Sequence, residues 1–228
     1  MENLLLKYME ESFHKNEYRP GSSYPPVVTL SREYGCPSKL IGQLLIDTIN
    51  RKITRHNAPK WRFINKELLE DAARELKMPE VNFNAMLGAE ERGIVLDIMT
   101  FSSTYGGSAH IRKTFQKTVR SFAMQGYVVI GGRGGVAITR ELPNSLHIRL
   151  QAPIAWRIRE VAARHGITET EAAKMAHTID AKRTKLIENL HGSKFSYSLF
   201  DLIYNCQTLS REEIVASVIQ VMSARNMI

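Results

Sequence analysis

The sequence has little cysteine and no long hydrophobic run. Only two cysteines occur among its 228 residues, Cys36 and Cys206, so it contains neither a disulfide framework nor the CxxC spacing of a structural zinc site. The longest apolar stretches, such as residues 127–130, are far shorter than the roughly 20 residues needed to cross a bilayer. The first residues include an acid and lack a signal-peptide core, so we expect a cytoplasmic chain without a membrane partner.

Acidic residues are also in short supply. The formal net charge is +8, with 31 Lys and Arg against 23 Asp and Glu. Such a surplus suits polyanionic partners, namely nucleotides, nucleic acids or anionic membranes, although the charge taken alone favours a basic solvated surface. At 43% hydrophobic and 24% charged, the composition is that of an ordinary globular protein that buries a full core without metals.

Five short apolar segments alternate with helical patterns. The predicted strands are 27–31, 61–64, 127–131, 146–150 and 201–205. Helical spacing covers 39–55, most of 65–125, 153–165, 168–190 and 211–222. This alternation is typical of βαβ units, so we predict an α/β fold with a parallel five-stranded sheet and helices on both faces.

The segment before the first strand forms a region of its own. Residues 2–16 carry apolar side chains at helical spacing, and residues 19–26 are rich in Pro, Gly and Ser. We therefore divide the chain into an N-terminal helix and linker, 1–26, and a main domain, 27–228. The apolar side of this helix is a candidate contact for a homo-oligomer.

A turn between the first strand and the next helix is a candidate phosphate site. Backbone N–H groups at a helix start attract anions, and the glycine at position 35 allows close approach. The usual phosphate-loop pattern, G-x-x-x-x-G-K-[ST], is absent. From the pattern alone, a turn of this kind is more often a plain structural connection than a ligand site.

Several motifs in order along the chain carry a resemblance. They are Ser31-Arg-Glu-Tyr-Gly35, Gly132-Arg133, Leu150-Gln-Ala-Pro153, residues 166–173, Asp180-x-x-Arg183 and Asp201. In this order the chain resembles the cytidylate kinase-like family over about residues 27–222. The resemblance implies a P-loop-type nucleoside monophosphate kinase fold, with a helical acceptor-binding segment at about 65–125 and a helical lid at about 153–194.

The resemblance also implies site residues and cofactors. Donor phosphates would meet Arg32, Gly35, Ser38 and Lys39. The acceptor would meet Asn65, Gly132 and Arg133. The lid would bring Arg157, Arg183 and Asp180 to the transferred group. The implied reaction moves a phosphoryl group from ATP, with Mg²⁺, to a nucleoside monophosphate such as CMP or dCMP, and the resemblance assigns no metal ligand.

Three positions depart from the family pattern. Ser38 stands where kinases of this type carry the phosphate-loop lysine, Asn65 replaces an Asp, and Gly134 replaces another Asp. Pro37 removes one backbone donor from the loop, although its fixed φ also suits a first helical position. Asn65 fits a helix N-cap as well as an acceptor contact. A second hypothesis is therefore a catalytically weak or inactive module that binds a nucleotide or phosphate for regulation.

A third hypothesis is a basic protein that binds nucleic acid. The predicted helix 108–125 carries several Lys and Arg residues opposite an apolar side. Such a helix could contact phosphates, but a packed amphipathic helix with a solvated basic side is commoner. We therefore expect a nucleotide, and not a nucleic acid, as the partner.

Overall fold

A computed structural model describes residues 24–53, 58–64 and 109–228. The chain divides into two compact units, one of residues 1–22 and 64–125 and the other of residues 23–63 and 126–228. The second unit contains almost all of the sheet. The expected N-terminal helix, Asn65 and most of the expected acceptor-binding segment lie outside the described residues.

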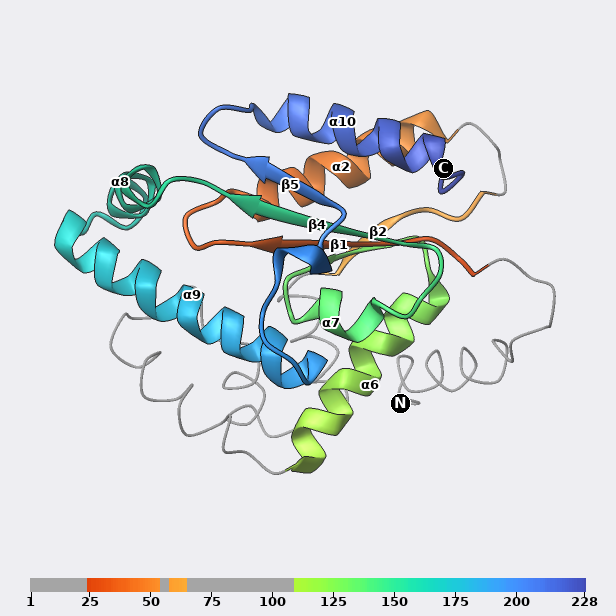
Figure 1. Cartoon of the computed structure of the whole chain (residues 1–228). Helices are drawn as coiled ribbons and strands as arrows, with labels where there is room; N and C mark the ends of the chain where they lie inside the picture. The colour runs from red at the N-terminus through yellow and green to blue at the C-terminus, as the bar shows by residue number, and fades with distance from the viewer. Residues whose placement is uncertain (1–23, 54–57, 65–108) are drawn as a thin grey trace, which may run out of the picture. The chain divides into compact units, whose positions relative to one another are not determined.

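The second unit is built on a five-stranded parallel sheet, as predicted (Figure 1). Its strands are β1 (Val27–Arg32), β2 (Arg62–Ile64), β3 (Val128–Gly131), β4 (Ser145–Gln151) and β5 (Leu202–Asn205). They follow the order β2-β3-β1-β4-β5, with β1 in the centre. The carboxyl ends of β1, β3 and β4 therefore lie at one edge of the sheet, where such folds bind ligands.

One face of the sheet is apolar. It is covered by α2 (Ser38–Lys52) and α10 (Arg211–Ala224), which lie side by side in Figure 1. Val28, Leu30, Ile148 and Leu150 point into this layer and are almost wholly buried. Their alternation along β1 and β4 follows from the two-residue period of a strand.

The opposite face of β1 and β4 is polar although it is buried. Thr29 pairs in register with His147, and Ser31 with Arg149, and all four residues are at least nine-tenths buried. This face looks toward α7 (Gly135–Thr139) and α9 (Glu169–His191), as Figure 1 shows. Buried polar groups need partners, so this layer is a network of hydrogen bonds and ion pairs.

His147 makes the fold sensitive to acid. Its Nδ1 lies 2.8 Å from the Thr29 hydroxyl and its Nε2 lies 3.1 Å from the Ser145 hydroxyl. Burial lowers the pKa of His147 below its usual 6.5. The unfolded chain therefore takes up a proton first as the pH falls below 6.5, and the free energy of unfolding decreases from there.

The change His147→Gln tests this dependence. Well above pH 6.5 the ring is neutral in both states, so the pH slope of stability should be the same in both proteins. Between about pH 6.5 and 5, the wild type should lose stability relative to the variant. Urea unfolding across this range measures the difference, and parallel curves would contradict the assignment.

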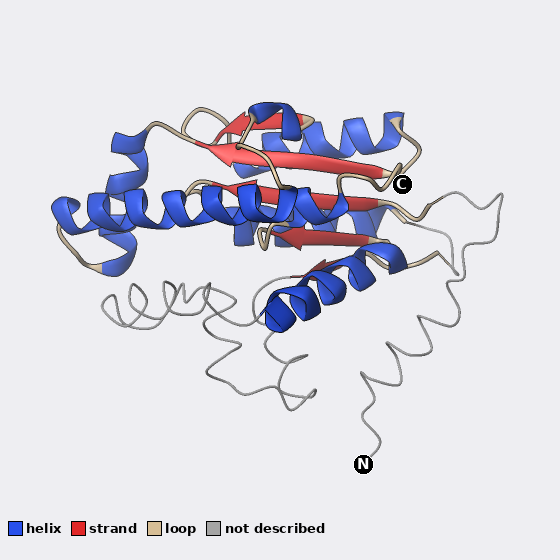
Figure 2. Cartoon of the chain, turned by 60° about the horizontal axis from the view of Figure 1, so that its bottom comes forward, coloured by secondary structure: helices blue, strands red, loops and turns tan. Residues whose placement is uncertain are grey.

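Two helices follow β4 and form the predicted lid segment. The first, α8 (Ile154–His165), ends at Gly166, whose left-handed φ of 63° closes the helix. The second, α9, begins with a capping box in which Thr168 and Glu171 each accept a hydrogen bond from the other's backbone N–H. Figure 2 shows α9 as a long helix running along the sheet.

The predicted elements that fall within the described residues agree with the structure to within a few residues. The helix expected over 39–55 spans Ser38–Lys52, and the strand expected over 146–150 spans Ser145–Gln151. Two short elements were not predicted, α7 and the 3₁₀ helix η1 (Tyr197–Leu199). Both are shorter than the window over which a periodic pattern can be detected.

The first unit contributes one described helix, α6 (Ala109–Gln125). Val119 and Phe122 are buried, whereas Lys117 and Arg120 are exposed. This alternation matches the amphipathic helix expected from the sequence. Among the described residues, none of the helices is both long enough and apolar enough for a bilayer.

Candidate functional site

The loop between β1 and α2 packs closely against the start of the lid. Gly35 has a φ of 100°, in the left-handed region that favours glycine. A Cβ added to Gly35 would lie 2.9 Å from the Cβ of Arg157 and 3.1 Å from its carbonyl oxygen. The glycine therefore allows the backbone of α8 to approach the loop.

Most backbone donors of this loop already have partners within the protein. Four of the five N–H groups in residues 33–38 donate as follows: Glu33 to Leu150 O (2.9 Å), Tyr34 to Asp180 Oδ1 (2.7 Å), Cys36 to Glu33 O (3.3 Å) and Ser38 to Cys36 O (2.9 Å). Pro37 has no N–H to offer. A phosphate cradle depends on several such groups facing the ligand, so this loop lacks most of its donors.

The residues at the start of α2 do not restore the missing lysine. Ser38 is the first residue of α2 and is buried, whereas Lys39 is exposed on the next position. One step along a helix turns the side chain by about 100°, so the two side chains project in different directions. The predicted donor-phosphate residues are thus adjacent in the fold, but they do not form a typical P-loop.

Alternating charges connect the loop to the lid. Glu33 lies 3.5 Å from Arg149 and 3.2 Å from Arg157. Asp180 lies 2.7 Å from Arg157 and 3.9 Å from Arg183. We call these five residues the ion-pair network. It brings together the three predicted catalytic residues, Arg157, Asp180 and Arg183.

Arg157 is the centre of this network. Its Nε donates to Ala152 O at 2.9 Å, and its Nη1 donates to Tyr34 O at 3.0 Å and to Asp180 at 2.7 Å. The residue is only 7% exposed. Its guanidinium thus holds together the loop after β1, the junction before α8 and the lid helix α9, which is a positioning role.

Sequence reasoning missed Glu33, Tyr34 and Arg149. Arg149 lies on β4, and three aromatic rings surround its guanidinium, with centroids 4.9 Å (Phe195), 5.6 Å (Tyr197) and 5.5 Å (Phe200) away. Its Nε is buried without a hydrogen-bond partner in the described structure. In the sequence, the signal for Arg149 was an arginine within a strand of otherwise buried character. The aromatic-rich segment 195–200 follows later in the chain.

The predicted acceptor residues lie in the turn between β3 and α7. Three successive residues are left-handed there, with φ values of 71° at Gly132, 58° at Arg133 and 65° at Gly134. The Arg32 guanidinium approaches this turn, since its Nη1 would lie 2.6 Å from a Cβ on Gly132. The turn therefore brings Arg32 and Gly132, predicted for different halves of the site, to the same place.

The substitution of Asp by Gly at position 134 has a structural counterpart. A Cβ on Gly134 would lie 2.1 Å from Leu190 Cδ1, because the end of α9 packs over this turn. The space that a side chain would need is thus occupied by the lid helix. The absence of a carboxylate at position 134 therefore goes together with the packing of Leu190, on α9, over this turn.

Arginines outnumber carboxylates at this edge of the sheet. Arg32, Arg149, Arg157, Arg183 and Arg164, whose Nη2 donates to Gly35 O at 3.3 Å, surround Glu33 and Asp180. An excess of guanidinium groups favours a phosphate ligand. Mg²⁺ does not fit the same residues, because arginines already pair with both carboxylates and the described residues hold no cluster of three His, Cys, Asp or Glu.

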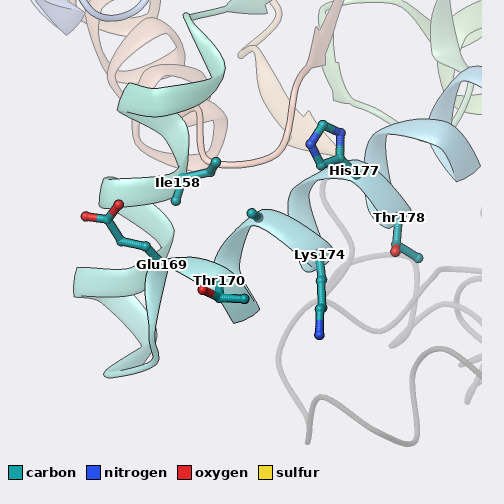
Figure 3. A pocket seen from close by; sticks show the side chains of 7 residues that line it. Ile158, Glu169, Thr170, Lys174, His177 and Thr178 are labelled. Atoms are coloured by element: carbon teal, nitrogen blue, oxygen red, sulfur yellow. The ribbon is translucent and has the colours of Figure 1, made fainter.

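A separate hollow lies between α8 and α9. It has a volume of about 680 Å³ and is lined by Ile158, Glu169, Thr170, Ala173, Lys174, His177 and Thr178. Figure 3 shows Glu169 and Lys174 pointing in different directions. Because no polar groups converge in it, this hollow is a weaker candidate for a ligand than the ion-pair network.

The fold is that of a nucleotide kinase-like protein. Two solved structures share this fold: an uncharacterized protein from Eubacterium ventriosum (TM-score 0.58, 17% identity, 88% of this chain and 99% of that chain) and a shikimate kinase from Bacteroides thetaiotaomicron (TM-score 0.50, 14% identity, 87% and 97%). At these identities the likeness establishes the fold alone.

The chain belongs to the cytidylate kinase-like family, whose profile matches residues 27–208. A sequence comparison also matches a uronate isomerase from Corynebacterium glutamicum, 24% identical over 161 residues. That match covers 68% of this chain but only 29% of the length of the isomerase. The profile match confirms the family resemblance seen in the motifs.

Proposed function

We propose that this protein binds a nucleotide through its arginine-rich edge and transfers phosphoryl groups weakly or not at all. The observation that carries this proposal is the closed phosphate loop, in which protein acceptors already engage the N–H groups of Tyr34, Cys36 and Ser38. Phosphoryl transfer depends on donors aimed at the developing charge. A nucleoside monophosphate, by resemblance CMP or dCMP, has one phosphate group and therefore needs fewer N–H donors from the loop than the triphosphate of ATP does.

Arg183 is the guanidinium of the network best placed to change partners. Its distance to Asp180 is 3.9 Å, and its Nη1 donates to Arg32 O at 3.4 Å, which is a long hydrogen bond. Its guanidinium also lies 5.6 Å from the centre of the Tyr34 ring. An incoming phosphate offers a shorter, charge-assisted contact than any of these.

The change Arg183→Ala should weaken CMP binding about 10- to 150-fold, because one charge-assisted hydrogen bond contributes about 1.5–3 kcal/mol. Titration calorimetry with CMP, dCMP, UMP and AMP measures the effect. Arg225→Ala is the matched control, because Arg225 also pairs with an aspartate, Asp201, but bonds to Ser145 at the amino end of β4. Equal losses in both variants would contradict the assigned site.

A kinase that uses ATP and Mg²⁺ is the second candidate. Family membership favours it, and so does the meeting of Arg157, Asp180 and Arg183. A coupled ADP-release assay over the same acceptors separates the two candidates. Turnover near 1 s⁻¹ or above, the usual range of kinases, would establish the kinase and overturn our proposal.

A further inference from the structure

The two cysteines of this chain, 170 positions apart in the sequence, meet at the carboxyl edge of the sheet. Cys36 lies in the loop after β1, and Cys206 is the first residue after β5. β4 separates these two strands, so the loop and the turn converge over its end. Here Glu33 accepts the Ala152 N–H at 3.3 Å, and the Cys206 N–H donates to Gln151 O at 2.8 Å.

Both thiols belong to one packed cluster. They are 5% and 8% exposed, and they lie in the apolar layer formed with α2 and α10. A hydrogen bond joins the thiols of Cys36 and Cys206. Neither thiol group has a role in the proposed nucleotide site. The described residues provide no third ligand that could hold a metal ion with the two thiols.

We propose that Cys36 and Cys206 are a redox modification site that forms a reversible intramolecular disulfide on reaction with a peroxide. The bond would join the phosphate loop to the turn that precedes α10. Two thiols packed together at the ligand edge, in a chain with no other cysteine, are the observation that supports this assignment.

The hydrogen bond between the thiols sets the order of the steps. It lowers the pKa of Cys206 and, together with burial, raises the pKa of Cys36. The Cys206 thiolate attacks the peroxide, so that an S–O bond forms, the O–O bond breaks, and the departing hydroxide leaves as water after gaining a proton. The Cys36 sulfur then attacks the sulfenic acid and displaces hydroxide, which takes up the Cys36 proton. Both thiols are oxidised, and one hydrogen peroxide is reduced to two waters.

The full-length protein, treated with hydrogen peroxide and then with an alkylating agent, provides the test. Mass spectrometry without reduction should find the peptides of Cys36 and Cys206 linked, and dithiothreitol should separate them. Oxidised wild type should also unfold at a midpoint about 5 °C or more above the reduced protein, because the bond closes a long loop.

Two single variants define the roles. Cys36→Ser should leave a sulfenic acid on Cys206 that a dimedone probe labels, whereas Cys206→Ser should leave Cys36 unlabelled. Wild type in which both cysteines stay alkylated, form sulfinic acids or link only between molecules would overturn the proposal. The wild-type measurement decides the matter even if a variant fails to fold.

Discussion

Replacing Arg157 by alanine is expected to lower the free energy of unfolding by about 3–5 kcal/mol. The side chain is only 8% exposed and pairs with Glu33 at 3.2 Å and with Asp180 at 2.7 Å. Its removal leaves two carboxylates without their common cation, and it leaves the carbonyl oxygens of Tyr34 and Ala152 without a donor. Glu33 keeps Arg149 at 3.5 Å and Asp180 keeps Arg183 at 3.9 Å, so each buried carboxylate loses its nearer cation, which is a costly change in a protein interior.

Arg159→Ala is the control for Arg157→Ala. Arg159 lies in the same helix, α8, but is exposed, so its loss should change the stability by less than about 0.5 kcal/mol. Urea unfolding of both variants measures the two values. If the Arg157 variant were as stable as the control, the ion-pair network would not hold the loop against the lid.

The second large effect is expected for Gly35→Ala, with a loss of about 3 kcal/mol. A φ of 100° strains any side chain, and the new Cβ would meet the Cβ of Arg157 at 2.9 Å and its backbone oxygen at 3.1 Å. Left-handed strain costs about 1–3 kcal/mol, and overpacking adds a similar amount because backbone atoms cannot rotate away.

The change Gly192→Ala measures the cost of left-handed backbone strain without steric crowding of the new Cβ. Gly192 is also left-handed, with a φ of 77°, but a Cβ there would meet nothing within 4 Å. Its replacement should therefore cost only about 1 kcal/mol. The difference between the two variants measures the contact between the phosphate loop and α8. Equal losses would show that this contact is loose.

The periodic part of the fold could be predicted from the sequence. Strand β1 begins with the apolar and β-branched run Val27–Leu30, and α9 is preceded by the N-cap Thr168, whose capping partner Glu171 lies three positions later. These signals are local, because a strand repeats every two residues and a helix every 3.6. The short elements α7 and η1 escaped prediction since each is too brief to show a period.

The candidate site could be predicted only as a set of residues. Order along the chain pointed to Arg157, Asp180 and Arg183, and the structure brings these three together. No pattern indicated that Arg157 would be buried at the centre of the network rather than at the ligand. The roles assigned to these side chains, and to Arg32, Gly35, Ser38, Lys39, Gly132 and Arg133, stay predictions until ligand binding is measured.

The sequence by itself determined the layers of this protein, its family and the absence of the G-x-x-x-x-G-K-[ST] pattern after the first strand. Only the tertiary structure decided that the loop is closed, because the acceptor of the Tyr34 N–H is a carboxylate 146 positions away. A sequence does not show which acceptor a backbone N–H will meet. The packing of α8 and α9 on the sheet places Asp180 beside the Tyr34 N–H. The pairing of β4 with β1 and with β5 brings Arg149 to Glu33 and Cys36 to Cys206.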